Sequence, residues 1–526
     1  MSYSVMSNIL ETSKVTGRPV YDGKIIDTEA FGNIVSGATI SEVIRELCGF
    51  FSIHFQDEEN VYLVTDRART IPLFYSVSEN RILVSDDFEW IKELLGSNAM
   101  CNHSYDEFLL TGYVCGSNTL HENIKQVEAG QLVKIRKSNG EVEFHDYFLL
   151  DHIEPAEYLL GDLECNLREV IDSVFSRLLT IANGRQIVLP LSGGFDSRLI
   201  ASTLKKLNYK NVVCFSYGKS GNKESTFSKN IADTLGYPWY FIEYTSEKWN
   251  QVWFSEEARA FQVMASKGVS LPHIQDWLAV HELKSSGVVD KDAIFVPGHS
   301  GDFVAGSHIP SEVFSNEKLN KSQLIKRIIL DHYSCLPIES SSTFANSSVL
   351  KEKIEDDLPM SFEETNTSYA NIYECWDWRE RQSKYIINSV RTYEFFGFDW
   401  WLPLWDKEFV EFWCRVPLLV RKERLWYNEE VSKIYESQAG DRNSLAKKNA
   451  AEKSMFRKLA HATYPILPKY IKKCIYKRKL RADFENHFLQ LGSLLSKPQK
   501  VENNKYNYTI IGIYNRLYLK NEWGKK

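Results

Sequence analysis

Residues 187–198 read Ile-Val-Leu-Pro-Leu-Ser-Gly-Gly-Phe-Asp-Ser-Arg, and no other stretch says as much about the architecture of this chain. An apolar strand over residues 187–191 runs into a Ser-Gly-Gly turn, and a helix-like run follows from Leu199. Such a turn gathers free backbone N–H groups and the positive end of the helix dipole around one point, and glycine lets the backbone approach a ligand closely. The sequence therefore predicts an α/β unit with an anion site at its turn.

Four side chains in or next to this turn bear on the anion site. Asp196 is a candidate Mg²⁺ ligand, because that ion prefers oxygen ligands and usually bridges to phosphates. Ser192 and Ser197 add hydroxyl donors, and Arg198 either adds a positive charge or points to solvent. The Walker spacing GxxxxGK[ST] is absent. A plain structural turn is the competing interpretation, and the six-residue pattern with its flanking strand and helix favours the anion site.

Length and composition describe a globular chain of two or three domains. It has 526 residues, 43% hydrophobic and 25% charged, and a net charge of −6, which gives no bulk attraction to nucleic acid or to a membrane. No apolar stretch reaches the length of a membrane span, and residues 1–12 lack the pattern of a secretory signal. Nine scattered cysteines without a CxxC pair favour reduced thiols. We expect a cytoplasmic protein with no nucleic-acid partner and no integral membrane part.

The pattern of short apolar runs changes near residue 155. Strand-like runs precede it at 50–55, 61–65 and 81–85, and 131–136 with 142–147 form an expected hairpin around a Lys-Ser-Asn-Gly turn. After it, a helix over 163–182 leads into strands at 187–191, 212–217, 239–244 and 293–296 that alternate with helices. This alternation predicts a parallel sheet with helices on both faces. Residues 320–440 are expected to be mainly helical.

A basic cluster lies near the C-terminus. Its members are Lys472, Lys473, Lys477, Arg478, Lys479 and Arg481. They could hold an anionic substrate, a carrier or a membrane surface, or simply form a solvated helix face.

Several motifs together resemble the asparagine synthetase-type proteins, in which a glutaminase-like domain precedes an ATP pyrophosphatase domain. The turn at 192–197 is similar to the pyrophosphate-binding SGGxDS loop, known as the PP-loop. Four other segments extend the match. In the first half, Asp66-Arg67 with Pro72-Leu73-Phe74-Tyr75 is similar to RDRxGxxPLYY, and Gly112-Tyr113-Val114 through Gly130 is similar to the end of the glutaminase domain. In the second half, Pro297-Gly298-His299-Ser300-Gly301-Asp302 through Gly306 is similar to SGEGxDE with its following glycine, and Glu394 through Leu402-Pro403-Leu404-Trp405-Asp406 is similar to EVRxPFLD.

The resemblance implies an α/β fold in three parts. Residues 1–155 would form a layered α/β/β/α domain of the Ntn-hydrolase type. Residues 163–445 would form a doubly wound parallel-sheet domain of the adenine nucleotide α-hydrolase (HUP, PP-loop) type with helical additions. Residues 446–526 would be a basic C-terminal extension.

The glutaminase-like half departs from the family pattern. The family places its nucleophilic cysteine directly after the initiator methionine, where this chain has Ser2. Thr65 stands where an arginine would clamp a glutamine carboxylate, and the Asn-Gly-Glu segment is missing. We expect an inactive glutaminase, with nitrogen supplied by free ammonia, by a separate glutaminase or by an amine on the substrate.

The resemblance also assigns site residues to the second half. Asp196 and Asp302 are the implied catalytic carboxylates and Mg²⁺ ligands, and His299 is a candidate general base. The implied ATP-binding residues are Leu191, Ser192, Gly193, Gly194, Asp196, Ser197, Phe215, Ser216, Tyr217 and Gly298. His299 and Phe303 stand where the family has glutamates, and Tyr427 lies in a region where related lactam-forming enzymes carry a lysine.

Weaker candidates surround this set. Cys214, Gly218 and Glu224 lie along or after the strand expected to carry adenine. Met264, Lys267, Gly268 and His273 precede the second motif and are candidates for a carboxylate-substrate pocket.

The implied activity is that of an ATP- and Mg²⁺-dependent carbon–nitrogen ligase. A small-molecule carboxylate would attack ATP to give an acyl-adenylate and pyrophosphate, and ammonia or an amine would then displace AMP. Amidation of a sugar acid in polysaccharide assembly is one candidate role. Two alternatives stay open: an intramolecular cyclase of the lactam or lasso-peptide type, and a nucleotide-binding pseudoenzyme. A homodimer also stays open.

Overall fold

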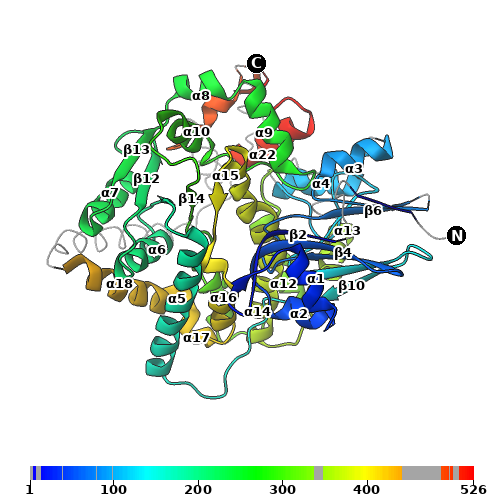
Figure 1. The fold of residues 1–526 in the computed structure, drawn as a ribbon, viewed down its shortest axis with the longest axis horizontal. Coiled ribbons are helices and arrows are strands. Elements are labelled where there is room, and N and C mark those ends of the chain that lie inside the picture. The colour runs from blue at the N-terminus through cyan, green and yellow to red at the C-terminus, as the bar shows by residue number, and fades with distance from the viewer. Residues whose placement is uncertain are drawn as a thin grey trace.

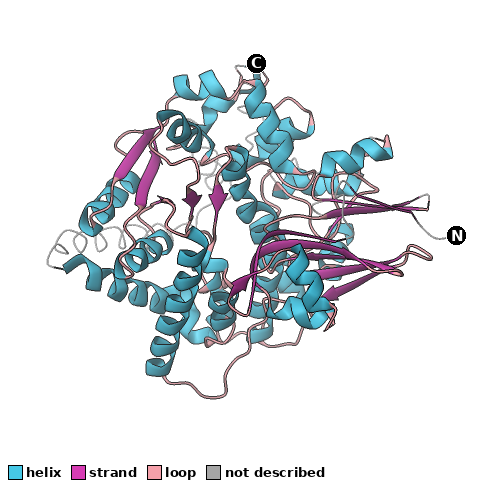
Figure 2. Cartoon of the chain, viewed as in Figure 1, coloured by secondary structure: helices cyan, strands magenta, loops and turns pink. Residues whose placement is uncertain are grey.

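The computed structural model describes residues 4–7, 13–37, 39–78, 80–97, 99–336, 348–440, 487–496, 498–500 and 509–525. Three sheets organise this part of the chain, two from the first 150 residues and one from the second half (Figures 1 and 2). The basic cluster between residues 472 and 481 lies outside the described residues, as does Ser2.

The first half forms a six-stranded sheet in the order β10-β9-β5-β4-β2-β3 and a four-stranded sheet in the order β1-β7-β6-β8. Their strands are β1 (Ser4–Ser7), β2 (Ser13–Tyr21), β3 (Lys24–Ile25), β4 (Cys48–Gln56), β5 (Asn60–Thr65), β6 (Phe74–Ser78), β7 (Arg81–Ser85), β8 (Lys125–Gln126), β9 (Gln131–Arg136) and β10 (Val142–Asp146). The strands predicted at 50–55, 61–65 and 81–85 are confirmed as β4, β5 and β7, and the predicted hairpin as β9 and β10.

Alternating side chains explain why these two sheets stack. In β9, Leu132 packs toward helices α1 (Thr28–Val35) and α2 (Ile40–Glu46), whereas Val133 packs into the layer between the sheets with Leu63 and Ile82. Helix α3 (Phe88–Leu95) covers the four-stranded sheet through Phe88. The order of layers is therefore helix, sheet, sheet, helix, as the expected α/β/β/α domain requires.

The second half is built on a parallel five-stranded sheet in the order β13-β12-β11-β14-β15. Its strands are β11 (Ile187–Pro190), β12 (Val212–Gly218), β13 (Trp239–Glu243), β14 (Ile294–Phe295) and β15 (Asp399–Trp400). The strand order reverses between β11 and β14, and ligands bind at such a switch point, beyond the carboxyl ends of the strands.

Helices cover both faces of this sheet, which confirms the doubly wound fold. On one face, the Tyr237 hydroxyl donates to the backbone of Ala201 in α6 (Phe195–Lys206) at 3.2 Å. On the other, Phe295 of β14 stacks on Tyr393 of α15 (Arg391–Phe395) with ring centroids 4.6 Å apart. The expected apolar stripe of the helix before β11 is also present, since α5 (Leu160–Ala182) buries Leu167.

The remaining elements are mostly helical, as predicted for residues 320–440. The other α-helices among the described residues are α4 (Asn102–Thr111), α7 (Lys223–Leu235), α8 (Ser246–Val252), α9 (Glu256–Ser266), α10 (Trp277–Ser286), α11 (Gly301–Val304), α12 (Lys321–His332), α13 (Ser348–Asp356), α14 (Asn366–Asp377), α16 (Lys407–Trp413), α17 (Leu418–Arg421), α18 (Leu425–Ala439) and α22 (Ile510–Leu519). The 3₁₀ helices are η1 (Ser311–Phe314), η3 (Ile387–Val390), η4 (Pro403–Trp405), η5 (Lys422–Arg424) and η8 (Leu491–Leu494), and η2 (Trp378–Ile386) is a π-helix. No helix among the described residues is both apolar and long enough to traverse a bilayer.

Buried charges join the two halves. Glu128, between β8 and β9, pairs with Arg379 at 3.2 Å and with Lys384 at 3.3 Å, and the Lys384 side chain is fully buried. The described C-terminal residues also pack back onto the molecule, because the Trp249 indole donates to the carbonyl of Leu489 at 2.9 Å and α22 lies against α4 (Figure 1). The domain boundaries at residues 155, 163 and 445 stay predictions.

Candidate active site

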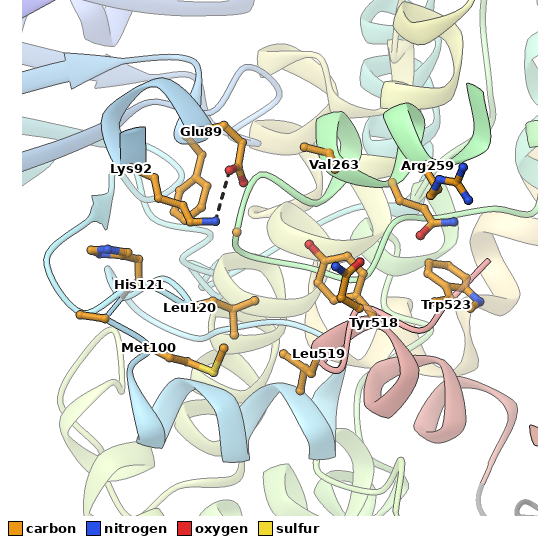
Figure 3. A pocket seen from close by; sticks show the side chains of 15 residues that line it. Glu89, Lys92, Met100, Leu120, His121, Arg259, Val263, Tyr518, Leu519 and Trp523 are labelled. Atoms are coloured by element: carbon orange, nitrogen blue, oxygen red, sulfur yellow. Dashed lines mark hydrogen bonds and ion pairs between the residues drawn. The ribbon is translucent and has the colours of Figure 1, made fainter. Parts of the chain in front are cut away.

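Two of the cavities in the described part of the chain contain residues singled out by the sequence. The larger, about 470 Å³, lies between α3, α9 and α22 (Figure 3). Its lining mixes apolar side chains such as Met100 and Leu120 with polar ones, among them a Glu89–Lys92 ion pair of 3.3 Å. The smaller, about 320 Å³, lies beyond the carboxyl ends of β11 and β14. It holds the glycine turn and both predicted carboxylates, so the chemistry points to the smaller cavity.

This smaller cavity gathers most of the residues predicted from sequence. Its lining is Pro190, Ser192, Gly194, Phe195, Asp196, Ser197, Tyr217, His273, Gln275, Asp276, Pro297, Gly298, His299, Asp302 and Arg424. Four of the residues implied for ATP, Leu191, Gly193, Phe215 and Ser216, are not among them. Leu191 and Phe215 are buried in the core, where the Leu191 N–H donates to the Phe215 carbonyl at 2.8 Å.

Hydroxyl groups of the turn after β11 accept hydrogen bonds from its own backbone and so fix its conformation. Helix α6 begins at Phe195 with Gly194 at the N-cap, and the Gly194 N–H donates to Ser192 Oγ at 3.1 Å. The Ser192 N–H donates to Ser197 Oγ at 3.1 Å. Glu224, from the first turn of α7, accepts from the Gly193 N–H at 3.1 Å. The N–H groups of this turn are therefore not free as the sequence predicted, because each already donates to a side chain of the protein, and a phosphate at the start of α6 would have to replace these acceptors.

Arg198 takes neither of its two expected positions. Its Nη2 donates to the carbonyl of Gly193 at 3.0 Å, and the guanidinium lies over the rings of Phe195 and Tyr435. It supports the turn from behind.

The two predicted carboxylates meet in the cavity. The Asp302 N–H donates to Asp196 Oδ2 at 3.1 Å, and the Tyr427 hydroxyl donates to Asp196 Oδ1 at 2.8 Å. Arg424 Nη1 pairs with Asp302 Oδ2 at 3.0 Å. Burial, and then the charge of Asp302, raises the pKa of Asp196 to about 7. A raised pKa in paired carboxylates marks a place where a cation would be stabilising.

The donor set fits Mg²⁺ bound together with phosphates. Two carboxylates supply part of an octahedral shell, and Mg²⁺ usually completes its shell with water and phosphate oxygens. Within the described residues, no group of three or more His, Cys, Asp or Glu side chains could form a full protein cage. Asp196 and Asp302 are therefore suited to a metal that arrives with a nucleotide.

The two loops touch so closely that glycine is required between them. A Cβ added at Gly298 would lie 2.7 Å from the backbone N of Ser197, and one added at Gly301 would lie 3.1 Å from Asp196 Cγ. The second motif thus packs directly on the turn after β11, which fixes the spacing of the two carboxylates.

His299 lines the cavity and is held by a residue of η3. Its Nε2 lies 2.9 Å from the Ser389 hydroxyl. Burial lowers the pKa of His299, so the ring is neutral at physiological pH and able to accept a proton.

The segment before the second motif divides between two places. His273 lines the cavity, whereas Gly268 lines the larger cavity and the Lys267 amine donates to the carbonyl of Asp86 at 2.9 Å. Lys267 therefore joins the two halves of the chain and is not part of the lining of the smaller cavity. Met264 is not part of either lining.

Sequence reasoning missed Asp276 and Arg424. Asp276, at the N-cap of α10, accepts from the hydroxyls of Tyr217 and Tyr393. Arg424 adopts a left-handed backbone, φ +51°, directly before α18. Its only signal in the sequence was a run of charged residues just before Tyr427.

The glutaminase-like half shows a structural role for its motif. Asp66 accepts from the backbone N–H of Phe51 at 3.1 Å and of Ala68 at 2.8 Å, and so closes a turn. The buried Thr65 hydroxyl donates to the carbonyl of Glu128. The inactivity expected for this half stays a prediction.

Comparison with known families agrees with this architecture. The family model described as asparagine synthase matches residues 169–495, and the model described as glutamine amidotransferase domain matches residues 25–148. The chain belongs to the asparagine synthase family.

One curated relative is the microcin J25-processing protein McjC of Escherichia coli, 28% identical over 305 residues. The match covers 57% of this chain and 54% of that protein, so the chain spans about half the length of the relative.

Similarity to solved structures is low. An NH3-dependent NAD synthetase from Campylobacter jejuni has a TM-score of 0.20 and 14% identity, covering 37% of this chain and 82% of its own. A glutamine phosphoribosylpyrophosphate amidotransferase from B. subtilis has a TM-score of 0.19 and 9% identity, covering 61% and 69%. Scores at this level add nothing to the fold described above.

Proposed function

We propose that the chain is an ATP-dependent amide-forming ligase that activates a carboxylate as an acyl-adenylate with release of pyrophosphate. The observation that carries the proposal is the meeting of Asp196 and Asp302 beside the turn at the start of α6, with the Asp302 N–H 3.1 Å from the Asp196 carboxylate. Membership of the asparagine synthase family supports ATP as the nucleotide.

Each part of the cavity has a task in this reaction. The start of α6 would bind the phosphate chain, and the N–H groups of the turn would join it by exchanging their present side-chain acceptors for phosphate oxygens. Mg²⁺, held by Asp196 and Asp302, would neutralise charge on the departing pyrophosphate. Arg424 holds Asp302 in place, and neutral His299 would take a proton from the attacking amine.

The nucleotide would extend from this turn along the end of β12. Tyr217 lines the cavity there, stacks on Tyr244 with centroids 5.2 Å apart and donates to Asp276. This fixed aromatic wall suits the flat face of an adenine base.

Pyrophosphate exchange tests the proposal. Purified full-length protein with ATP, Mg²⁺ and a panel of carboxylic acids is expected to exchange labelled pyrophosphate into ATP. Asp196→Asn is expected to lower exchange by at least about 100-fold, because the metal loses a ligand. Asp172→Asn is the matched control, since Asp172 is exposed on α5 and pairs with Lys206 at 2.6 Å. Exchange that persists at the wild-type level in Asp196→Asn would refute the proposal.

The nitrogen donor is tested in the same assay. Ammonia and glutamine are compared with the isolated chain, and we expect ammonia or an amine on the substrate to work and glutamine to fail. Glutamine-dependent turnover would overturn the proposal that the first half is an inactive glutaminase.

A second candidate function is amide formation within one peptide. It is favoured by the similarity to McjC, whose name says that it processes microcin J25. Mass spectrometry separates the two, because a cyclase product loses one water and incorporates no isotopically labelled ammonia.

A further inference from the structure

The larger of the two cavities has no task in the proposed reaction, yet it has the dimensions of a ligand pocket. Its volume of about 470 Å³ falls within the range of about 300–1,000 Å³ that is usual for small-molecule sites. Helix α3 of the first half, α9 of the second half and α22 near the C-terminus each supply part of its wall (Figure 3). Small molecules often bind at such junctions between parts of a protein.

The walls of this cavity are fixed by contacts of the protein with itself. Residues 99–101 and 120–122 pair through backbone hydrogen bonds of 3.0 Å, from Cys101 to Leu120 and from Glu122 to Ala99. The ring of Tyr518 is stacked on that of Phe108, with centroids 5.6 Å apart. A wall that is already ordered loses little conformational entropy when a ligand binds, so more of the contact energy is available for affinity.

One part of the lining is apolar and open to water. It consists of Met100, Leu120, Val263 and Leu519. Met100 is 49% exposed and Val263 is 52% exposed, so both leave apolar surface in contact with solvent. Because removal of apolar surface from water is favourable, an apolar group that fills the cavity would be stabilised here.

The charged groups of the lining leave one cation over. Glu89 and Lys92 pair with each other at 3.3 Å. Arg259 is half-buried, and within the part of the chain that the structure describes no carboxylate pairs with its guanidinium. Figure 3 shows Arg259 and Lys92 on opposite sides of the view, with Tyr518 between them. An arginine without a carboxylate of its own is suited to bind an anionic group through two parallel hydrogen bonds.

The other polar groups of the lining also favour an acceptor as the ligand. Both ring nitrogens of His121 are engaged, since Nε2 lies 2.9 Å from the Ser97 carbonyl and Nδ1 accepts from the Asn123 N–H at 3.2 Å. Gln262 Nε2 and Trp523 Nε1 are buried without a hydrogen-bond partner among the described residues, and both are donors. The buried atoms that this lining leaves unpaired therefore call for oxygen acceptors.

We propose that the larger cavity binds an amphiphilic carboxylate, that is, one carboxylate group on an apolar chain. Arg259 pairs with the carboxylate, and Leu120 and Leu519 cover the chain. The two cavities have no lining residue in common, so this site is distinct from the candidate active site and does not depend on the ligase function.

Titration calorimetry on the full-length chain, without nucleotide, tests the site with three probes. Octanoate carries both the charge and the chain, acetate lacks the chain, and octylammonium has the opposite charge. Octanoate is expected to bind, and the other two are expected to show no binding at the same concentrations. Acetate that binds as tightly as octanoate, or octylammonium that binds as tightly, would overturn the assignment.

Substitutions of Arg259 test the ion pair. Arg259→Gln is expected to weaken octanoate binding by about 10- to 100-fold, because the charged hydrogen bonds are lost, and Arg259→Lys is expected to retain part of the affinity. Arg168→Gln is the control, since Arg168 is an exposed helical arginine outside the lining that pairs with Glu164 at 3.5 Å, and it should match wild type.

A second pair of variants leaves the arginine in place. Val263 lies one helical turn after Arg259 in α9 and is exposed, so substitution there does not disturb the core. Val263→Glu supplies Arg259 with a carboxylate at i+4 and repels the anion, and it should weaken octanoate binding about as much as Arg259→Gln. Val263→Gln has the same shape without the charge and should keep most of the affinity.

The outcomes for this site are separate from those for the ligase, because the calorimetry needs no turnover. Equal octanoate affinity in wild type, Arg259→Gln and Val263→Glu, or no binding in wild type, overturns the proposal even if pyrophosphate exchange is observed. Binding that is lost in Arg259→Gln and Val263→Glu and kept in Val263→Gln supports it, whether or not exchange occurs. Circular dichroism confirms that each variant is folded before it is compared.

Discussion

The close approach of the two nucleotide-site loops predicts that Gly298→Ala disables ATP binding. The new Cβ would stand 2.7 Å from the Ser197 N and 3.1 Å from Asp196 Cβ, so the loops must separate by about 0.7 Å to reach ordinary contact. Forced overpacking of this kind costs about 1–3 kcal/mol. Because the displaced atoms belong to the turn proposed to bind phosphate, the cost should appear as a weakening of ATP affinity of roughly 5- to 150-fold.

Titration calorimetry with ATP and Mg²⁺ measures that affinity, and circular dichroism checks the fold. Gly32→Ala is the matched control, because a Cβ at Gly32 in α1 meets nothing within 4 Å. That variant should bind ATP normally and gain about 0.5–1 kcal/mol in stability, since alanine suits a helix better than glycine. A wild-type dissociation constant for Gly298→Ala would refute the idea that contact between the loops sets the site.

Three further predictions concern stability. Arg421→Met should lower the free energy of unfolding by about 3–5 kcal/mol in urea titrations. The reason is that the buried carboxylate of Glu374 loses the guanidinium that donates to it at 3.2 Å and 2.7 Å. The double variant with Glu374→Gln should recover part of the lost stability. Burial lowers the pKa of His54 to about 4, below its value in the unfolded chain. The neutral ring therefore contributes to the free energy of unfolding above about pH 6.5, and this contribution is lost as the pH falls toward 4. His54→Leu should remove roughly 2–3 kcal/mol of this acid sensitivity, and an unchanged pH profile of stability would contradict the prediction. Burial lowers the pKa of Lys267 to about 8, so the unfolded chain binds more protons between pH 8 and 10 and stability rises with pH there; in Lys267→Met unfolding curves this rise should be absent.

The sequence was sufficient for the features that local chemistry determines. The Ser-Gly-Gly turn, the strand before it and the helix after it are contiguous, and their pattern alone placed Asp196 and Ser197 in the cavity. The alternation of strands and helices predicted the doubly wound sheet. Asp302 followed from a motif whose spacing matched the family.

Contacts between distant segments were not readable in this way. Arg424 reaches Asp302 across 122 positions, and His308 reaches Asp377 across 69. Phe215 was expected near the nucleotide because its strand ends there, yet it is buried in the core one pleat before Tyr217, which does line the cavity. Position along a strand, and not membership of it, determines which side chains face a ligand.

The pairing of Glu128 with Arg379 and Lys384 has a consequence for how this chain can change over time. A shortened protein that starts after residue 155 would lack Glu128, which leaves the almost buried Arg379 without this partner and the fully buried Lys384 with Glu380 alone, at 2.6 Å. Glu128 thus gives the amino-terminal half a structural role as a counter-charge, whatever chemistry that half performs. Substitution of single glutaminase residues would leave these ion pairs intact, whereas deletion of the whole domain would remove Glu128 from both.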